Sequence, residues 1–534
     1  MQEKEIKWII VTGGVLSGLG KGVATASIGK LLPKDKKIVT VKCDGYLNVD
    51  PGTMNPIEHG EVFVLDDGGE VDMDFGHYER FLGITCKFSW NLTSGKIFNN
   101  VIEKERRGDY LGKTIQIFPH LSEEIKAQLF QIAAAEDADV MMIEIGGTVG
   151  DIENSWFLEA ARQLKKTFGS KNTAYIHLTY IPYLDNVGEL KTKPAQRDIS
   201  LLRQISITPD IVICRAREKV NDKLKEKLAK MTDLDKEQII SGHDIKDTIY
   251  EIPLNFQKEG VYRILKEKLG LEKIEDLKEW QELVEKIKHP SREKTIAICG
   301  KYTDLKDSYA SIIEALKHSG AHTDTKINIK WIETTDIENK DLTVQEALKG
   351  AEGVIVPGGF GTRGTEGKIE VIKYARQNNI PFLGLCFGLQ LAVIEFARNV
   401  CGIENAGSTE IDKDCEPVIC ILPEQAKIMK KGGTMRLGSY EAILEEGSRV
   451  KEIYGTTIVH ERHRHRYEVN PKYHTILKEK GMVFSGMNRE KTLVEFIELP
   501  NHKFFIATQA HPELKSRLEK PAPLFLGFVK ACLD

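Results

Sequence analysis

Short apolar runs rich in β-branched residues alternate with helical patterns along this chain. In the first half these runs are IKWIIVT, KKIVTVK, DVMMIEI, TAYIHLTYI and DIVICR, and several of them end in glycine-rich or polar loops. Continuous apolar runs of this length are typical of strands that helices cover on both faces. The pattern therefore predicts an α/β fold with a parallel sheet, whose ligands bind beyond the carboxyl ends of the strands.

The chain changes character between residues 264 and 293, a stretch that is charged, helical and ends in His-Pro-Ser. A fresh strand, TIAICGKYT, then opens a second α/β unit, and later strands are predicted at GVIVPGG, FLGLC and FFIATQAHP. A chain of 534 residues is long enough for more than one domain. We expect a first domain over residues 1–268, a linker helix over 269–294 and a second domain over 295–534.

Composition narrows the class of protein. The net charge of −4 argues against a nucleic-acid partner bound on a basic face. The nine cysteines show no C-x-x-C spacing, which favours reduced thiols and a cytoplasmic location. The apolar part of the N-terminal segment is too short for a signal peptide, and no apolar run approaches the ~20 residues that span a bilayer. We therefore expect no membrane partner.

The stretch VTGGVLSGLGKGVATA, residues 11–26, has the strand–loop–helix context of a phosphate-binding loop. Gly20 and Lys21 supply the usual Gly-Lys pair, and Lys21 could reach terminal phosphates. Val15 stands where the common pattern has its first glycine, and Gly22 replaces the Ser or Thr that holds magnesium. The alternative is a tight turn without a ligand.

A phosphate loop without its Ser or Thr needs other magnesium ligands, and carboxylates are the usual ones. Asp74 lies in GGEVDMDFGHYERF, and Glu144 closes the predicted strand DVMMIEI, where a side chain points into the crevice. A salt bridge or a helix cap is the alternative for either residue alone. Asp151 and Glu153 follow closely and could bind ribose hydroxyls.

The segment GELKTKPAQRD carries Lys191, Lys193 and Gln196. Pro194 disfavours a continuous helix, so we expect these residues on a loop. They could form a second anion site for another phosphorylated molecule, or they could simply be solvated.

The turn GLCFG places Cys386 between a predicted strand and a predicted helix. This is the sharp elbow that exposes a nucleophile, and the following helix N-terminus favours a thiolate. Downstream, His511 could act as the base and Glu513 could orient it. Backbone N–H groups at Gly358 and Gly359 could stabilise an oxyanion. A buried, inert cysteine is the alternative.

The motifs PGGFG, GLCFG and AHPE resemble those of class I glutamine amidotransferases of the triad type, and the first half resembles a P-loop amidoligase of the dethiobiotin-synthetase type. Together with GGVLSGLGKG, NVDPGTM, GHYERF, KERRGDYLGKT, KTKP and GGTMRLG, they resemble the CTP synthase family from about residue 7 to about residue 530.

This resemblance implies a ligase of pyrimidine biosynthesis. Glutamine would be hydrolysed at Cys386, ATP would phosphorylate the 4-oxygen of UTP, and ammonia would displace that phosphate to give CTP. The resemblance further implies Mg²⁺, ATP as co-substrate, GTP as allosteric activator, inhibition by CTP, a cytoplasmic homotetramer and the capacity to form filaments.

The resemblance also implies roles for individual residues. The catalytic residues would be Cys386, His511, Glu513 and Lys21, with magnesium held by Asp74 and Glu144. ATP would contact Gly18, Leu19, Gly20, Lys21, Gly22, Val23, Asp74, His243, Asp244 and Ile245. UTP or CTP would contact Ser17, Asp151, Ile152, Glu153, Lys191, Thr192, Lys193, Pro194, Ala195, Gln196 and Lys227. Glutamine would contact Gly359, Phe387, Gly388, Leu389, Gln390, Glu410 and Arg466, while Arg363 would sense GTP, Lys42 would face phosphate and His59 would gate an ammonia tunnel.

Five residues depart from the family pattern: Gly45, Trp156, Phe387, Gly407 and Ala510. Two alternatives to the CTP synthase interpretation remain. One is another glutamine-dependent amidoligase, such as a cobyrinate-amidating enzyme, against which KTKP and GHYERF argue. The other is a non-catalytic scaffold or filament protein that uses nucleotide as a switch, against which the intact Cys386, His511, Glu513 and Lys21 argue.

Overall fold

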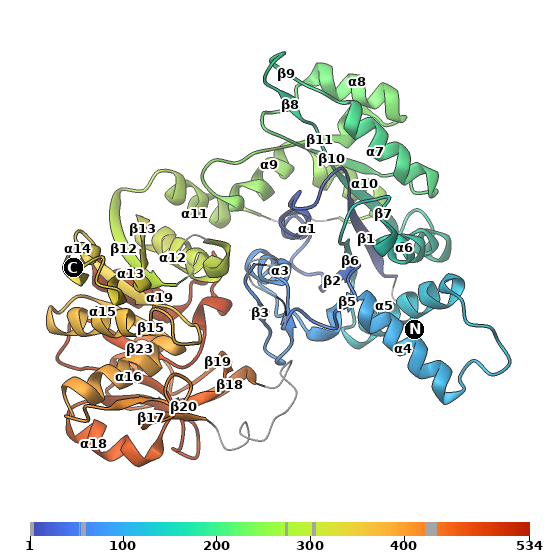
Figure 1. The fold of residues 1–534 in the computed structure, drawn as a ribbon. Helices are drawn as coiled ribbons and strands as arrows, with labels where there is room; N and C mark the ends of the chain where they lie inside the picture. Colours follow the sequence, from blue (N-terminus) through green and yellow to red (C-terminus); the bar gives the residue numbers. More distant parts are fainter. Residues whose placement is uncertain (1–4, 53, 55–59, 273–275, 302–305, 422–434) are drawn as a thin grey trace. The chain divides into compact units, whose positions relative to one another are not determined.

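The computed structural model describes the chain except residues 1–4, 53, 55–59, 273–275, 302–305 and 422–434 (Figure 1). The chain forms two compact units, the first made of Met1–Pro51 and His77–Gln281 and the second of Gly52–Gly76 and Glu282–Asp534. The domain limits that the sequence predicts, at residues 268 and 295, are not tested by this division and remain a prediction. His59 lies outside the described residues.

The first unit is built on a seven-stranded sheet in the order β11-β10-β7-β1-β6-β2-β5, in which every neighbouring pair is parallel. The strands are β1 (Lys7–Gly13), β2 (Ile38–Asp44), β5 (Asn91–Thr93), β6 (Val140–Ile145), β7 (Thr173–Tyr180), β10 (Ile211–Ala216) and β11 (Ile239–His243). Their side chains are almost all buried, which explains the continuous apolar runs. The parallel sheet that the sequence predicts is therefore confirmed.

Helices connect these strands. Helix α1 packs against β1 and β6, and α7 packs against β7 (Figure 1). The helices are α1 (Lys21–Lys30), α4 (Ser94–Arg107), α5 (Ser122–Ala135), α6 (Ser155–Phe168), α7 (Lys193–Gln204), α8 (Asp222–Thr232), α9 (Ile252–Lys258) and α10 (Val261–Leu269), and α3 (Asp74–Leu82) and α11 (Lys278–Lys288) cross the limits of the units.

The second unit has a nine-stranded sheet in the order β13-β12-β14-β15-β23-β22-β21-β18-β19. Its first five strands are parallel, and the remaining pairs are antiparallel. The strands are β12 (Arg292–Gly300), β13 (Thr325–Glu333), β14 (Gly353–Val356), β15 (Phe382–Leu385), β18 (Arg436–Leu444), β19 (Ile458–His465), β21 (Val483–Met487), β22 (Val494–Glu498) and β23 (Phe505–Thr508). A smaller sheet has the order β16 (Ala406–Ser408), β17 (Glu416–Ile421), β20 (Tyr467–Val469).

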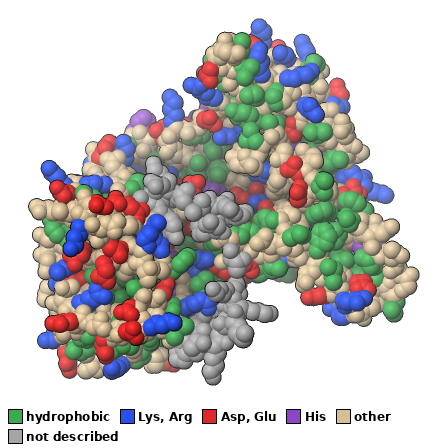
Figure 2. Space-filling view, viewed as in Figure 1, with side chains coloured by type: hydrophobic (Ala, Val, Ile, Leu, Met, Phe, Trp, Pro, Cys, Tyr) green, Lys and Arg blue, Asp and Glu red, His purple; other side chains and the backbone are tan. Residues whose placement is uncertain are grey.

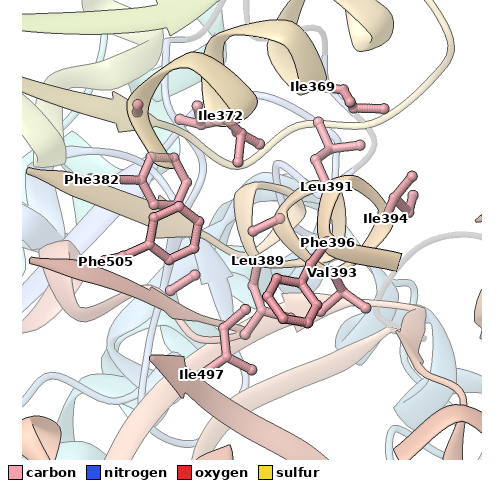
Figure 3. Packing of buried hydrophobic residues seen from close by; sticks show 14 of the residues in the cluster. Ile369, Ile372, Phe382, Leu389, Leu391, Val393, Ile394, Phe396, Ile497 and Phe505 are labelled. Atoms are coloured by element: carbon pink, nitrogen blue, oxygen red, sulfur yellow. The ribbon is translucent and has the colours of Figure 1, made fainter. Parts of the chain in front are cut away.

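One hydrophobic core of the second unit lies between the nine-stranded sheet and two neighbouring helices, α15 (Thr365–Gln377) and α16 (Phe387–Asn399). Figure 3 shows Ile372 of α15 and Leu389 of α16 beside Phe382 of β15 and Phe505 of β23. The two phenylalanine rings stack with their centroids 4.5 Å apart. This packing fixes the start of α16, and with it the residue that precedes the helix. The other helices are α12 (Ala310–Thr323), α13 (Thr334–Glu338), α14 (Val344–Leu348), α17 (Arg449–Tyr454), α18 (His474–Glu479) and α19 (Pro523–Leu533).

The early segment Gly52–Gly76 belongs to the second unit because charged side chains tie it there. Asp66 accepts a hydrogen bond from Arg462 at 2.5 Å, and Glu70 accepts one from Arg464 at 2.8 Å. Over the face visible in Figure 2, acidic and basic side chains are interspersed, in keeping with the small net charge. Every helix in the described part of the chain is too short or too polar to cross a bilayer.

One sequence prediction of local structure is wrong. Lys193, Pro194, Ala195 and Gln196 form the first turn of α7 instead of a loop, while Lys191 and Thr192 precede the helix. Proline is tolerated in a first helical turn because its missing N–H has no helical partner there.

Candidate functional site

The turn at Cys386 has the strained geometry of a nucleophile elbow. Cys386 joins β15 to α16 with φ 50° and ψ −100°, outside the regions that a non-glycine residue favours. A β-carbon on Gly388 would lie 2.2 Å from the carbonyl oxygen of Val356, and one on Gly384 would lie 2.8 Å from Ala507. The two glycines therefore let the helix approach the sheet closely enough to form the turn.

Cys386, His511 and Glu513 converge on this turn. The imidazole Nδ1 of His511 lies 2.7 Å from a carboxylate oxygen of Glu513. A β-carbon on Gly358 would lie 2.8 Å from the His511 ring and 3.6 Å from the β-carbon of Cys386, so both side chains lie close to Gly358. Burial opposes the charge on His511, but the charges of Glu513 and Cys386 outweigh it and hold the pKa of His511 well above its ordinary value. The site therefore favours an imidazolium beside the sulfur.

A pocket opens beside the sulfur of Cys386. Its lining includes the loop Gly358–Phe360, Tyr309, Arg464 and His511. Gln509, which the sequence prediction missed, donates to the Cys386 sulfur at 3.6 Å and in turn accepts from Gln390 at 3.3 Å. Gln509 belongs to the same TQAHPE stretch that carries His511, so its position in the motif was the available signal.

The other residues predicted to hold glutamine lie close to this turn or on the loops around it. Phe387, Gly388, Leu389 and Gln390 form the buried first turn of α16, and Gly359 lines the pocket. Glu410 accepts a hydrogen bond from the backbone N–H of Gly361 at 3.0 Å, and burial raises the pKa of Glu410. Arg466 lies between β19 and β20, and Arg363 is exposed and donates to the carbonyl of Lys301 at 2.7 Å.

In the first unit the predicted phosphate loop leads into α1, which begins at Lys21. Val15, Gly18 and Gly20 all have positive φ angles, so the loop turns sharply around exposed backbone. The Lys21 ammonium donates to the carbonyl oxygen of Gly147 at 2.7 Å. Its stem lies over Gly13, where a β-carbon would be 2.9 Å from the Lys21 δ-carbon.

A largely apolar pocket lies beside this loop. Five residues of the predicted ATP group line it, namely Leu19, Gly20, Val23, His243 and Ile245. The sequence prediction missed the apolar wall that Ile249, Ile252 and Phe256 add, because such residues look like ordinary core. Asp244, exposed near this pocket, pairs with Arg215 at 2.8 Å. The apolar lining suits a weakly polar ring such as a purine.

Glu144 lies at the carboxyl end of β6 and is 1 % exposed. Its carboxylate accepts a hydrogen bond from Tyr78 at 2.5 Å and lies 3.7 Å from the ammonium of Lys42. Asp44, at the end of β2, lies 3.1 Å from the same ammonium and was missed, although the strand-end rule that selected Glu144 applies to it. These hard oxygen donors suit Mg²⁺. Asp74 begins α3 in the other unit, so its pairing with Glu144 stays a prediction.

Most of the residues predicted to contact UTP or CTP lie on loops and helix ends. Ser17, Asp151, Ile152 and Glu153 are exposed, the last three at the turn before α6. Lys191 pairs with Glu189, and Lys227 is exposed on α8. The structure leaves their shared role as a prediction.

Most of the departures from the family pattern have local structural reasons. A β-carbon on Gly45 would lie 2.8 Å from the carbonyl oxygen of Glu153, and one on Gly407 would lie 2.7 Å from Cys415. Trp156 is buried in the first turn of α6 and donates to Ser94 at 2.9 Å, so it ties α6 to α4. The Phe387 ring lies 5.3 Å from the ammonium of the buried Lys368. Nothing in the structure explains Ala510.

Two family models match the chain. "CTP synthase N-terminus" matches residues 7–271, and "Glutamine amidotransferase class-I" matches residues 304–531. The chain is 53 % identical over 538 residues to the CTP synthase of Methanococcus maripaludis, covering 99 % of this chain and all of that relative. It is 51 % identical over 539 residues to the CTP synthase of Borreliella burgdorferi, with 99 % and 100 % covered.

Among solved structures, the Trypanosoma brucei CTPS glutaminase domain with bound acivicin is 38 % identical. The match covers 45 % of this chain and 94 % of that one, with a TM-score of 0.42.

Proposed function

The chain belongs to the CTP synthase family, whose reaction is the ATP-dependent amination of UTP to CTP with nitrogen from glutamine, and we propose that its two units divide this reaction. The full-length relationship decides against a different glutamine-dependent amidoligase. The observation that carries the proposal is the strained Cys386 turn with His511 and Glu513 beside it. This arrangement belongs to the second unit, whereas the phosphate loop belongs to the first.

In the second unit, the sulfur of Cys386 attacks the amide carbon of glutamine. Backbone N–H groups of Gly359 and Phe387 stabilise the oxyanion. His511, held protonated by Glu513, gives a proton to the departing ammonia, and water then hydrolyses the thioester to glutamate. The burial of Glu410 and the hydrogen bond that it accepts from Gly361 support a role in fixing the loop beside bound glutamine.

In the first unit, the γ-phosphoryl group of ATP passes to the 4-oxygen of UTP, and ammonia then attacks C4 and releases phosphate. The sum is ATP, UTP and ammonia to ADP, phosphate and CTP. The apolar pocket receives the adenine, the α1 N-terminus and Lys21 receive the phosphates, and the start of α7 receives the pyrimidine triphosphate. Carboxylates of Glu144 and Asp74 would hold Mg²⁺, which offsets phosphate charge when bound.

The finer features of the family complete the proposal. GTP acts as an activator through Arg363, and CTP inhibits at the turn that carries Asp151 to Glu153. The chain works in the cytoplasm as a homotetramer that also forms filaments. The exposure of Arg363 and of the turn before α6 supports ligand access at both places.

An oxygen-tracing experiment tests the chemistry of the first unit. UTP labelled with ¹⁸O at position 4 is incubated with the chain, ATP, Mg²⁺ and ammonium. We expect one labelled oxygen in each inorganic phosphate formed, because the 4-oxygen leaves with the phosphoryl group. Label released as water would contradict the phosphorylated intermediate. Failure to form CTP would instead favour the scaffold alternative.

A further inference from the structure

Three buried polar side chains form a continuous hydrogen-bonded chain beneath the phosphate loop. The hydroxyl of Thr12, near the end of β1, lies 2.8 Å from Nδ1 of His177 on β7. Nε2 of His177 lies 2.8 Å from a carboxylate oxygen of Asp198 on α7. All three are at most 3 % exposed. Thr12 and His177 are register partners in neighbouring parallel strands, so the sheet itself sets the first contact.

Asp198, at the far end of this hydrogen-bond network, packs against the phosphate loop. Oδ1 of Asp198 lies where a β-carbon on Gly14 would be only 1.7 Å away. Only glycine fits there, and the contact leaves Asp198 against the backbone of the loop. The neighbouring Gly13 is covered from its own side by the stem of Lys21. Lys21 therefore packs against Gly13, and Asp198 of α7 packs against the next residue, Gly14.

The same hydrogen-bond network is also linked, through Asp198, to the first turn of α7. Asp198 lies one helical turn after Pro194, on the helix whose first residue is Lys193. A displacement of that first turn would move Asp198, and Asp198 cannot move without disturbing Gly14 and His177. The backbone N–H of Gly14 also donates to the carbonyl of Leu178, the residue after His177. The loop, β7 and the start of α7 are thus fastened at several points.

We propose that His177 and Asp198 are positioning residues that couple the two nucleotide sites, so that ATP on the phosphate loop tightens the binding of UTP at α7. The inference rests on the proposed function, which places those ligands at those two elements. Each nucleotide must order its own element. The phosphate loop and the start of α7 share one hydrogen-bond network. The nucleotide that binds first therefore orders part of the structure that the second nucleotide would otherwise have to order.

The test measures coupling rather than activity. UTP affinity is determined by calorimetry with and without a saturating non-hydrolysable ATP analogue and Mg²⁺, on the full chain. We expect the analogue to tighten UTP binding about tenfold in the unmodified protein, and UTP to tighten the analogue by the same factor. In Asp198→Ala this ratio should fall to within about twofold of unity, whereas Asp198→Asn, which keeps an acceptor for His177, should retain most of it.

Two further variants keep the test decisive. Thr12→Val removes only the terminal hydroxyl at nearly constant volume, and it should also reduce the ratio if Asp198→Ala does not fold. Tyr175→Phe is the matched control. It removes a buried hydrogen bond to Ala161 from the same strand β7, but it takes no part in the Thr12–His177–Asp198 hydrogen-bond network. Its coupling ratio should be unchanged. Circular dichroism and thermal unfolding of each variant report that it is folded.

The outcomes are separable. An unmodified protein without coupling would overturn the inference. So would variants that bind both nucleotides more weakly but keep the same ratio, because that is what a purely structural role would give. Absence of UTP and analogue binding in the unmodified protein would instead contradict the proposed function.

Discussion

At the scale of single residues, the glutaminase site depends on the charge of His511. Glu513 lies 2.7 Å from His511 and, together with Cys386, outweighs burial to raise the pKa of the imidazole. A raised pKa means that the imidazolium is present at low and neutral pH and is lost only as pH rises through the raised value. Glutamine hydrolysis should therefore fall on the alkaline side when His511 loses its proton.

Glu513→Gln should move that alkaline fall to lower pH, because the substitution removes the charge that holds the proton. Activity at neutral pH should drop about 10²-fold. The measurement is kcat/KM for glutamine hydrolysis as a function of pH. Glu416→Gln, which alters an exposed pair with Lys472 in the same unit, is the control and should leave the profile unchanged. An alkaline limb that stays in place in Glu513→Gln would show that another group titrates there.

At the scale of elements, the approach of α16 to the sheet decides where Cys386 stands. Gly388→Ala would place a β-carbon 2.2 Å from the Val356 carbonyl oxygen, so the helix start must move and carry the Cys386 turn with it. Glutamine-driven CTP formation should fall more than about 100-fold, because small displacements of a reacting group are costly. Ammonia-driven formation should stay within about twofold of the unmodified rate, since it does not use this turn.

A matched substitution in the same unit is Gly527→Ala in α19. The β-carbon there would lie 2.9 Å from the δ-carbon and 3.1 Å from a γ-carbon of Ile453, so it would meet one side chain and no backbone atom within 3.4 Å. Both rates should be retained in this variant. Equal loss of both rates in Gly388→Ala would mean that the substitution unfolds more than the turn.

Some of these elements could be predicted from the sequence, and others could not. Strands β1, β2, β6, β7 and β10 of the first sheet and the Cys386 turn follow from local patterns, because burial on both faces and glycine-rich turns leave clear signals. The prediction of a loop at Pro194 was wrong because proline, which disfavours the interior of a helix, is tolerated in the first helical turn. The chain from Thr12 to Asp198 could not be foreseen, since it depends on β1 lying next to β7. That order is a property of the whole sheet.

At the scale of the whole molecule, the chain combines an ammonia-producing unit with an ammonia-consuming one. Cys386, His511 and Glu513 belong to the second unit and Lys21 to the first, so we expect that one step can be removed without the other. Cys386 serves only glutamine hydrolysis in this account, while Lys21 and the nucleotide pockets serve only the synthesis.

The most direct measurement compares CTP formation by the unmodified chain and by Cys386→Ala, each with UTP, ATP and Mg²⁺ and with either glutamine or ammonium. The account predicts that both nitrogen sources support the unmodified chain. In Cys386→Ala, glutamine should give no detectable CTP, and ammonium should give a rate within about twofold of the unmodified one. Loss of both reactions in a folded Cys386→Ala protein, or CTP formed from glutamine without the thiol, would contradict it.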